Sequence, residues 1–333
     1  MIFRPVGASD LARVTPLLTG DEANTLTADQ FRRRLQNGEY RSEWTWIAEQ
    51  AGKEDTSNPP AAVAIWWGRP QDSLPSALDG LVAAAQEGSA DRIMLAAGLL
   101  TAAHQAYARA GADRPPDYHI FLPADWHDRQ DAIAEVGWRR EAAQQAGLTV
   151  ALERLGYEWT PDAGLPSRTG RLTFRQEAAD AVFAGLFSRV LLGTLDATSR
   201  RAAESAGPLA QARQDVRFYR EKMLGQRAWW RVAHTPAGEI AGFGIPSQNT
   251  DYPVVGYLGV LPEHRGHGYV GEILAEITRI LVAETGATAI RADTDVENRP
   301  MAAAFERAGY RVHGRRLVLS APSAGQAGGA AAP

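Results

Sequence analysis

The segment Val254-Val-Gly-Tyr-Leu-Gly-Val260-Leu-Pro-Glu-His-Arg265-Gly-His-Gly268-Tyr-Val270 joins an apolar run to a turn with two closely spaced glycines, and an amphipathic pattern follows over 268–284. These patterns predict a strand, a tight turn and a helix. The first N–H groups of a helix have no partner within it, and the helix dipole adds about half a positive charge there. Because glycine has no Cβ, phosphate oxygens can approach the backbone closely. The segment therefore predicts a site for a ligand with a phosphorylated tail.

Two common nucleotide-binding motifs do not account for this segment. Gly266, Gly268 and Gly271 have the spacing G-x-G-x-x-G of a Rossmann turn, but the order of the flanking predicted strands is not that of a Rossmann fold. A P-loop would end in Gly-Lys-Ser or Gly-Lys-Thr, which this segment lacks. Glycine is also frequent at any turn between a strand and a helix. The spacing alone thus leaves a purely structural turn as an alternative.

Residues 171–319 show a regular succession of short apolar runs and helical patterns. The predicted order is β-α-α-β-β-β-α-β-α-β, which corresponds to an α/β fold with a mixed, mostly antiparallel sheet and helices on both faces. The predicted strands cover 171–176, 228–233, 240–245, 254–260, 289–294 and 310–319, and the predicted helices cover 179–192, 215–224, 268–284 and 300–308.

The first half of the chain carries a faint repeat of the second. Phe3-Arg4 and Phe174-Arg175 each stand in a short predicted strand, and Glu153-Arg-Leu-Gly-Tyr157 matches Glu306-Arg-Ala-Gly-Tyr310. The parallel placement predicts two diverged copies of one α/β unit. In the first copy we expect a hairpin, a long helix and a strand over 44–49 with 61–67, 93–110 and 118–122, with an irregular stretch over 69–90.

Composition suggests where one copy ends and the next begins. Residues 161–170 are rich in proline, glycine and small polar residues, as in a linker, and residues 320–333 are mostly alanine, glycine, serine and proline, as in a disordered tail. The sequence therefore predicts a first domain over 1–160 and a second over 171–319.

The bulk properties of the 333 residues restrict the function classes. The net charge is -4, without the clustered basic surface that a nucleic-acid partner requires. The chain has no cysteine, which excludes disulfides and a cysteine nucleophile. No apolar stretch is long enough to span a bilayer, so we expect a cytoplasmic protein without a membrane partner. His264 and His267 have no third ligand at suitable spacing, so we expect no metal.

The glycine-containing segment resembles motif A of the GNAT superfamily of N-acyltransferases, Arg/Gln-x-x-Gly-x-Gly/Ala. Arg265 and Gly268 fall on this motif, and Val270 departs from it, although Gly271 follows. The run Asn298-Arg-Pro-Met301-Ala-Ala-Ala-Phe305-Glu-Arg-Ala-Gly309-Tyr310 is similar to motif B, and the predicted element order is the GNAT order. The resemblance covers about 171–319 and implies a tandem-domain GNAT N-acetyltransferase with acetyl-CoA as co-substrate.

The resemblance also implies where acetyl-CoA binds. Strand 254–260 would pair with pantetheine in a gap between two parallel strands, and one of its N–H groups would polarise the thioester carbonyl. The turn would hold the diphosphate, and two motif B residues would contact the pantetheine arm. The implied cofactor-binding residues are Leu258, Gly259, Val260, Arg265, Gly266, His267, Gly268, Tyr269, Val270, Asn298 and Phe305.

The resemblance implies direct attack of a neutral amine on the thioester, with proton removal by the enzyme. Phe305 occupies the place where many relatives have an acidic tyrosine, so Tyr257, Tyr269 and Tyr310 become substitutes to test. Asp295 is the predicted base, chosen over Asp293, Glu297 and Asp251 because it stands nearest the strand gap. Two alternatives stay open: these carboxylates cap the helix that begins near Arg299, or a water chain accepts the proton.

The first half lacks the phosphate motif, because Gly88-Ser-Ala-Asp91-Arg-Ile stands in its place. We therefore expect a degenerate GNAT-like domain that binds no CoA and helps to enclose the acceptor. The pairs Trp66-Trp67 and Trp229-Trp230 are expected on corresponding strands, either as core residues or as an aromatic substrate wall.

The acidic character of the chain favours a small cationic amine as acceptor. A non-catalytic acyl-CoA sensor or scaffold is the alternative function, which Phe305 favours. Acylation of a protein is a third possibility, and it would need an open peptide groove. A monomer and a homodimer both remain open.

Overall fold

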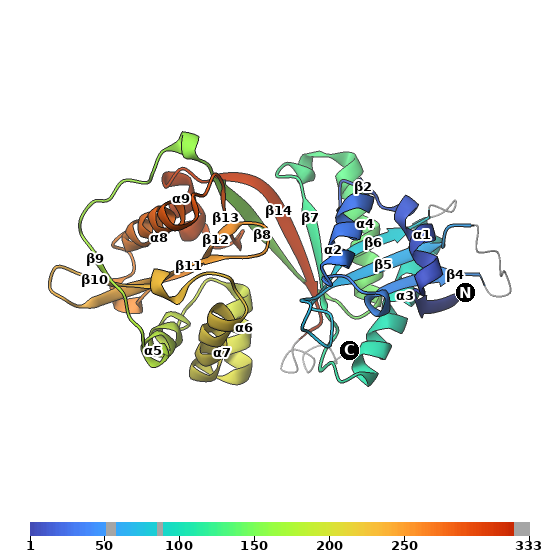
Figure 1. Cartoon of the computed structure of the whole chain (residues 1–333), viewed down its shortest axis with the longest axis horizontal. Coiled ribbons are helices and arrows are strands. Elements are labelled where there is room, and N and C mark those ends of the chain that lie inside the picture. The colour runs from blue at the N-terminus through green and yellow to red at the C-terminus, as the bar shows by residue number, and fades with distance from the viewer. Residues whose placement is uncertain (51–57, 85–88, 323–333) are drawn as a thin grey trace, which may run out of the picture. The chain divides into compact units, whose positions relative to one another are not determined.

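The computed structural model describes residues 1–50, 58–84 and 89–322, which form two compact units (Figure 1). Unit 1 contains residues 1–153 and the C-terminal segment from Gly314, and unit 2 contains Arg154–His313. Both units have the predicted α/β architecture, each with its own hydrophobic cores.

Unit 2 contains a six-stranded sheet in the order β8-β13-β12-β11-β10-β9. Neighbouring strands are antiparallel except β12 and β13, which are parallel. The strands are β8 (Val150–Trp159), β9 (Thr173–Arg175), β10 (Arg231–His234), β11 (Ile240–Gln248), β12 (Pro253–Val260) and β13 (Ile290–Asp295).

Helices cover both faces of this sheet, as predicted. One core contains residues of α8 and α9, and a second contains residues of α5, α6 and α7. The helices are α5 (Asp180–Val190), α6 (Ala197–Ala206), α7 (Pro208–Glu221), α8 (Tyr269–Thr285) and α9 (Arg299–Arg307). The sequence analysis missed α6, because its apolar residues are all alanines and give only a weak periodic signal.

Unit 1 contains the corresponding sheet in the order β1-β4-β5-β6-β7-β14. Its strands are β1 (Ile2–Pro5), β4 (Thr45–Glu49), β5 (Ala62–Trp67), β6 (Ala77–Ala83), β7 (Asp117–Leu122) and β14 (Arg311–Ser320). The small strands β2 (Thr19–Asp21) and β3 (Asn24–Thr27) form a hairpin, and the α-helices are α1 (Leu11–Val14), α2 (Ala28–Gln36), α3 (Ser89–Arg109) and α4 (Gln130–Gln145). Strand β6 lies within the stretch that we expected to be irregular, because Asp79-Gly80 interrupts its apolar pattern.

The chain crosses between the units inside two strands. The second part of β8 pairs with β13 of unit 2, from Ile290↔Trp159 to Asp295↔Arg154. The second part of β14 pairs with β7 of unit 1, from Arg315↔Leu122 to Leu319↔Tyr118. Each half of the sequence thus supplies the last strand of the other unit.

This strand exchange places the unit boundaries at 153/154 and 313/314, whereas the sequence analysis placed them at 160/171 and 319. Residues 161–170 belong to unit 2, where Arg168 and Thr169 bind Glu276 and Glu272 of α8. The expected disordered tail lies largely outside the described residues, which end at Pro322.

One of the two repeat signals is structural. Phe3 and Phe174 occupy equivalent edge strands, opposite Ala48 and Ala233. The match between 153–157 and 306–310 is accidental, because the first segment lies inside β8 and the second ends α9 and enters a turn.

The two tryptophan pairs also differ in position. Trp66 lies in β5, whereas Trp229-Trp230 precedes β10, the counterpart of β4, so the expected correspondence is wrong. Trp66, Trp229 and Trp230 are all buried. Their burial supports core packing over a substrate wall.

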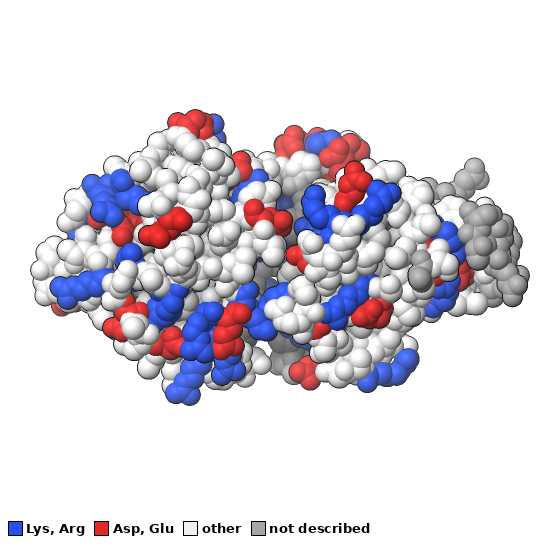
Figure 2. Space-filling view, viewed as in Figure 1, with Lys and Arg blue, Asp and Glu red and all other residues white. Residues whose placement is uncertain are grey.

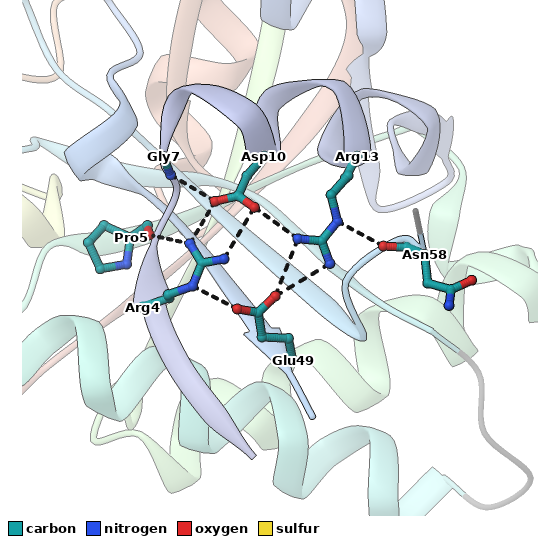
Figure 3. A network of polar contacts seen from close by, with 7 residues as sticks. All are labelled: Arg4, Pro5, Gly7, Asp10, Arg13, Glu49 and Asn58. Carbon is teal, nitrogen blue, oxygen red and sulfur yellow. Dashed lines mark hydrogen bonds and ion pairs between the residues drawn. The ribbon is translucent and has the colours of Figure 1, made fainter. Parts of the chain in front are cut away.

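A polar network fixes the first residues of unit 1 to β4 (Figure 3). Asp10 and Glu49 each accept hydrogen bonds from both Arg4 and Arg13. The hydrogen bond from Arg4 lowers the pKa of the Asp10 carboxyl to about 2. The network therefore contributes to stability only while Asp10 is ionised.

Charged side chains are mixed over the surface. On the face shown in Figure 2, basic and acidic residues lie next to one another over both units. Among the described residues, every helix is too short or too polar to cross a membrane.

Candidate active site

The parallel strands β12 and β13 separate soon after they begin. Within the described residues their register contains the single pair Val254↔Arg291, whereas β12 pairs with β11 along its length. The N–H of Leu261 donates to the carbonyl of Ala241. Because hydrogen-bonding direction alternates along an antiparallel ladder, the backbone groups of Leu258 and Val260 face the β13 side. The strand gap implied by the family resemblance is therefore present.

Most of β12 is only half-buried although it is an inner strand of its sheet. Gly259 is the exception, and it is required by packing: a Cβ there would lie 2.7 Å from Val190 of α5. The carbonyl of Val260 accepts a hydrogen bond from Arg265 Nε at 3.3 Å. The N–H groups of Leu258 and Val260 and the carbonyl of Leu258 remain available to a ligand.

The turn after β12 presents a row of backbone donors. Gly266 and Gly268 have positive φ values of 81° and 74°, which glycine adopts without strain, and Gly268 caps the start of α8. Within the described part of the chain, the consecutive N–H groups of residues 266–270 donate to no protein acceptor. Such a row at a helix N-terminus binds an anion well. The backbone of Gly266, His267, Gly268, Tyr269 and Val270 thus lies where the sequence predicts the phosphate site.

Arg265 braces this turn. Its guanidinium donates to the carbonyls of Val190, Leu192 and Gly193 at the end of α5, at 2.8–3.3 Å. The positive charge therefore compensates the carbonyl end of α5. Its direct role is to hold the turn against the helix, rather than to extend into the row of N–H groups.

Arg171 is a cation at the turn that the sequence analysis missed. Its Nη1 donates to the carbonyl of His267 at 2.8 Å, and its Nε donates to the buried carboxylate of Glu272 at 2.9 Å. A Cβ built on Gly268 would lie 3.6 Å from Arg171 Nη2. Because Arg171 is far in sequence from the glycine-containing segment, no local pattern predicted this contact.

The two motif B residues behave differently. Asn298 is half-buried, and within the described residues its side-chain amide makes no hydrogen bond, so it is free to bind a ligand. Phe305 is only 1% exposed and lies between Tyr157 and Tyr310, with ring centroids at 4.9 and 5.3 Å. Phe305 is thus a core residue, and the expected contact with the pantetheine arm does not fit its position.

Asp295 caps a helix, although not the one that the sequence suggested. Its side chain is buried, one oxygen accepts from the N–H of Ala197 at 2.6 Å, and the other lies 3.2 Å from Arg154. Burial raises the pKa of Asp295. Asp295 therefore fixes the start of α6, which leaves it poorly placed to act as a base.

A carboxylate and a tyrosine of α7 near β12, Asp215 and Tyr219, were not predicted, whereas Tyr257 of β12 was. Tyr219 of α7 donates its hydroxyl to the carbonyl of Gly256 at 2.7 Å, and its ring lies 6.4 Å from that of Tyr257. Asp215 stands one helical turn before Tyr219, and burial raises its pKa to about 6. Asp215 had no motif to mark it, since only the packing of α7 over β12 places it at the site.

The remaining tyrosines and histidines that the sequence singled out have contacts within the protein. Tyr310 is buried, and its hydroxyl bonds to that of Thr278 at 2.7 Å. Tyr269 packs against His267, with ring centroids 5.7 Å apart. His264 faces Glu239 at 4.0 Å. Among the described residues, no group of three or more histidine and acidic side chains is arranged to hold a metal ion.

Comparison with known proteins gives consistent results. Residues 171–311 match the family model described as an acetyltransferase (GNAT) domain. The fold is similar to a GCN5-related N-acetyltransferase from Sphaerobacter thermophilus, with a TM-score of 0.55 and 17% identity, covering 97% of this chain and 96% of that one. No curated protein sequence matches the chain.

Two further solved structures are similar. One is a GCN5-related glucosamine N-acetyltransferase region of a fungal multi-domain GH3 beta-N-acetylglucosaminidase, with a TM-score of 0.51 and 16% identity, covering 95% of this chain and 38% of that one. The other is a tandem GNAT protein from the clavulanic acid biosynthesis pathway, with a TM-score of 0.47 and 17% identity, covering 97% and 99%.

The chain thus has the fold of the GCN5-related N-acetyltransferases, and the match to the GNAT acetyltransferase domain model covers residues 171–311. This fold supports acyl-CoA-dependent acetyl transfer in general.

Proposed function

We propose that unit 2 binds acetyl-CoA and transfers its acetyl group to a primary amine of a small molecule. The proposal rests on two successive segments with backbone N–H groups that have no hydrogen-bond partner among the described residues. These are the edge of β12 that faces β13 and the row of N–H groups at residues 266–270. The first suits the amide groups of pantetheine, and the second suits a diphosphate.

Each residue of this site has a separate role in the proposal. The N–H groups of Leu258 and Val260 lie on the edge that would pair with pantetheine, and one of them would stabilise the developing negative charge on the thioester oxygen. Arg171 adds a positive charge beside the turn, and Arg265 holds the turn in place. Asn298 offers a free amide to the pantetheine arm.

Calorimetric titration with acetyl-CoA tests the site. We expect one site per chain in the wild type and a loss of affinity of at least about tenfold in Gly266→Asp, because the added carboxylate repels the diphosphate. Gly238→Asp is the matched control, since Gly238 also has a positive φ of 85° and open space around its Cα, but lies in the turn between β10 and β11. Equal affinity in both variants would contradict the proposed site.

The alternative function, a non-catalytic acyl-CoA sensor, shares this site and differs in turnover. An enzyme releases free CoA only when an acceptor amine is present, whereas a sensor releases none. Phe305 is buried and has no proton to donate, so measured turnover distinguishes the two functions.

A further inference from the structure

Four carboxylates from β13, α7 and the start of α6 act on the surroundings of β12 in unit 2. Three of them share one cation: Arg154 of β8 lies 2.8–3.3 Å from Asp196, Asp293 and Asp295. Asp196 and Asp295 also cap α6, through the N–H groups of Ser199 and Ala197. All three carboxylates are thus paired with Arg154.

Asp215 of α7 is the fourth carboxylate, and its environment differs. One of its oxygens accepts a hydrogen bond from Gln211 Nε2 at 2.8 Å. In the described part of the chain no cation lies within ion-pair distance of Asp215, although the residue is half-buried. Burial raises its pKa to about 6, and the negative charge of Asp196 acts in the same direction. Asp215 therefore remains free to hold a proton.

The position of Asp215 relative to β12 follows from its neighbours. Tyr219, on the next turn of α7, bonds to the backbone of Gly256 in β12, two residues before Leu258. The charge of Asp215 contributes to the raised pKa of both Tyr219 and Tyr257, although burial is the main cause in each case. The carboxylate thus interacts with both phenols at the strand edge.

Several charged groups on the elements around α7 have partners. On the packed helix α5, Asp180 is paired with Arg220. On α6, Arg200 donates to the carbonyl of Thr194. Asp293 of β13 is bound by Arg154, and its charge also acts on Tyr219.

We infer that Asp215 accepts the proton of the attacking amine and that the acceptor is a small cationic amine. This inference rests on the proposed function. The carboxylates attract a cation. Among the described residues, no arginine forms an ion pair with Asp215.

The reacting ammonium group first releases one proton to the solvent. The neutral amine nitrogen then attacks the thioester carbon, and the nitrogen of the tetrahedral species becomes strongly acidic. Its proton moves to Asp215, the C–S bond breaks, and the thiolate of CoA takes up that proton from Asp215. The products are the amide, free CoA and the proton released to the solvent, and Asp215 returns to its ionised form.

The test combines binding and turnover in Asp215→Asn, which keeps the size of the side chain and its bond to Gln211. Calorimetry measures acetyl-CoA affinity, and release of free CoA is followed from pH 5 to 9. The acceptors are 1,4-diaminobutane, lysine amide and glucosamine, with 4-methoxyaniline as an amine that is uncharged at pH 7. Glu221→Gln is the matched control, because Glu221 lies on α7 in an exposed ion pair with Arg220.

We expect Asp215→Asn to bind acetyl-CoA within twofold of the wild type and to lose at least about 100-fold in kcat/KM. Wild-type kcat/KM for the cationic amines should rise with pH through about 6, where Asp215 ionises, and this rise should be absent in Asp215→Asn. Glu221→Gln should match the wild type in both measurements.

Three results would overturn the inference: activity of Asp215→Asn within threefold of the wild type, an unchanged pH profile, or preference for the uncharged amine. Acetyl-CoA binding without CoA release from any of the cationic amines would overturn it as well, while leaving the cofactor site intact. Absence of acetyl-CoA binding in the wild type would instead refute the proposed function itself.

Discussion

The two units contain equivalent pairs of parallel central strands, β12 and β13 in unit 2 and β6 and β7 in unit 1, but the exposed strand edge has different partners in each. In unit 2 the β13-facing edge of β12 stays open after Val254↔Arg291. In unit 1, β6 and β7 pair at Ala77↔Asp117 and Leu78↔Tyr118 and then separate in the same way. The ladders beside them even share an irregularity, between Ile65 and Trp66 in one unit and between Ile245 and Pro246 in the other.

The difference is Arg139 of α4. Its side chain is fully buried, and its Nε donates to the carbonyl of Leu81 at 3.1 Å. The pair Ala84 and Ala61 in unit 1 corresponds to Leu261 and Ala241 in unit 2, so Leu81 is the counterpart of Leu258. The strand edge that we propose as the pantetheine site of unit 2 therefore has a counterpart in unit 1 that is occupied by the protein's own guanidinium.

The two units thus have the same strand geometry with different surroundings. In unit 1, Arg139 binds the backbone of β6, and Asp21 and Glu135 neutralise its charge at 2.6 Å.

Arg139→Met should give the largest stability effect. It leaves the carbonyl of Leu81 and the carboxylate of Asp21 without their cation, while Glu135 keeps Arg92, and removal of one partner from a buried pair costs about 4 kcal/mol. Urea unfolding measures the change. Arg140→Met is the control, because Arg140 is the exposed neighbour on the same helix. Equal stability of the two variants would show that Arg139 does not fill the strand edge.

Arg154→Met should destabilise unit 2 by a smaller amount. Its three carboxylate partners would lose their cation, but Asp196 and Asp293 are partly exposed and water would compensate, which leaves about 2 kcal/mol. Burial already raises the pKa of Asp295 in the folded protein, so protonation relieves the repulsion. The difference from the wild type should shrink as the pH falls and Asp295 becomes protonated, and urea unfolding across pH checks this.

Asp10→Asn should have the smallest effect on the free energy of unfolding. It tests the network that fixes the edge strand β1, for which the equivalent strand β9 of unit 2 provides the comparison. The folded-state pKa of Asp10 is lowered from 3.8 to about 2, so its contribution is present above pH 4 and is lost as the pH falls to about 2. We expect a loss of about 1 kcal/mol at pH 7 and almost none at pH 2. Thermal unfolding at both pH values checks this prediction.

The control for the edge strands is Arg175→Gln. Arg175 is the counterpart of Arg4, and within the described residues it forms no ion pair. It should leave stability unchanged at both pH values, and a loss like that of Asp10→Asn would show that the network is not specific to unit 1.

The sequence predicted the elements that carry strong patterns. The helix after Gly268, the strand before Leu261 and the phosphate turn between them were all recognisable, because local periodicity and glycine spacing determine them. The alanine-rich α6 and the interrupted strand β6 gave weaker patterns and were missed.

The side chains considered for proton transfer were less predictable, because their positions depend on tertiary packing. Asp295 looked available in its strand, but it caps α6, a helix that the sequence did not reveal. Asp215 reaches β12 only because α7 packs over that strand. The similarity of 153–157 to 306–310 misled in the opposite direction. The two segments differ at one position only, yet one lies in a strand and the other at the end of a helix.

The exchanged strands β8 and β14 have a consequence for synthesis on the ribosome. The chain emerges from its N-terminus, so residues 1–153 are available for folding long before residues 314–320 appear. Until then the edge of β7 has no β14 to pair with, whereas β13 finds β8 already made. Unit 1 is therefore translated first and completed last, and a chain that stops before Gly314 would lose a strand from its first unit.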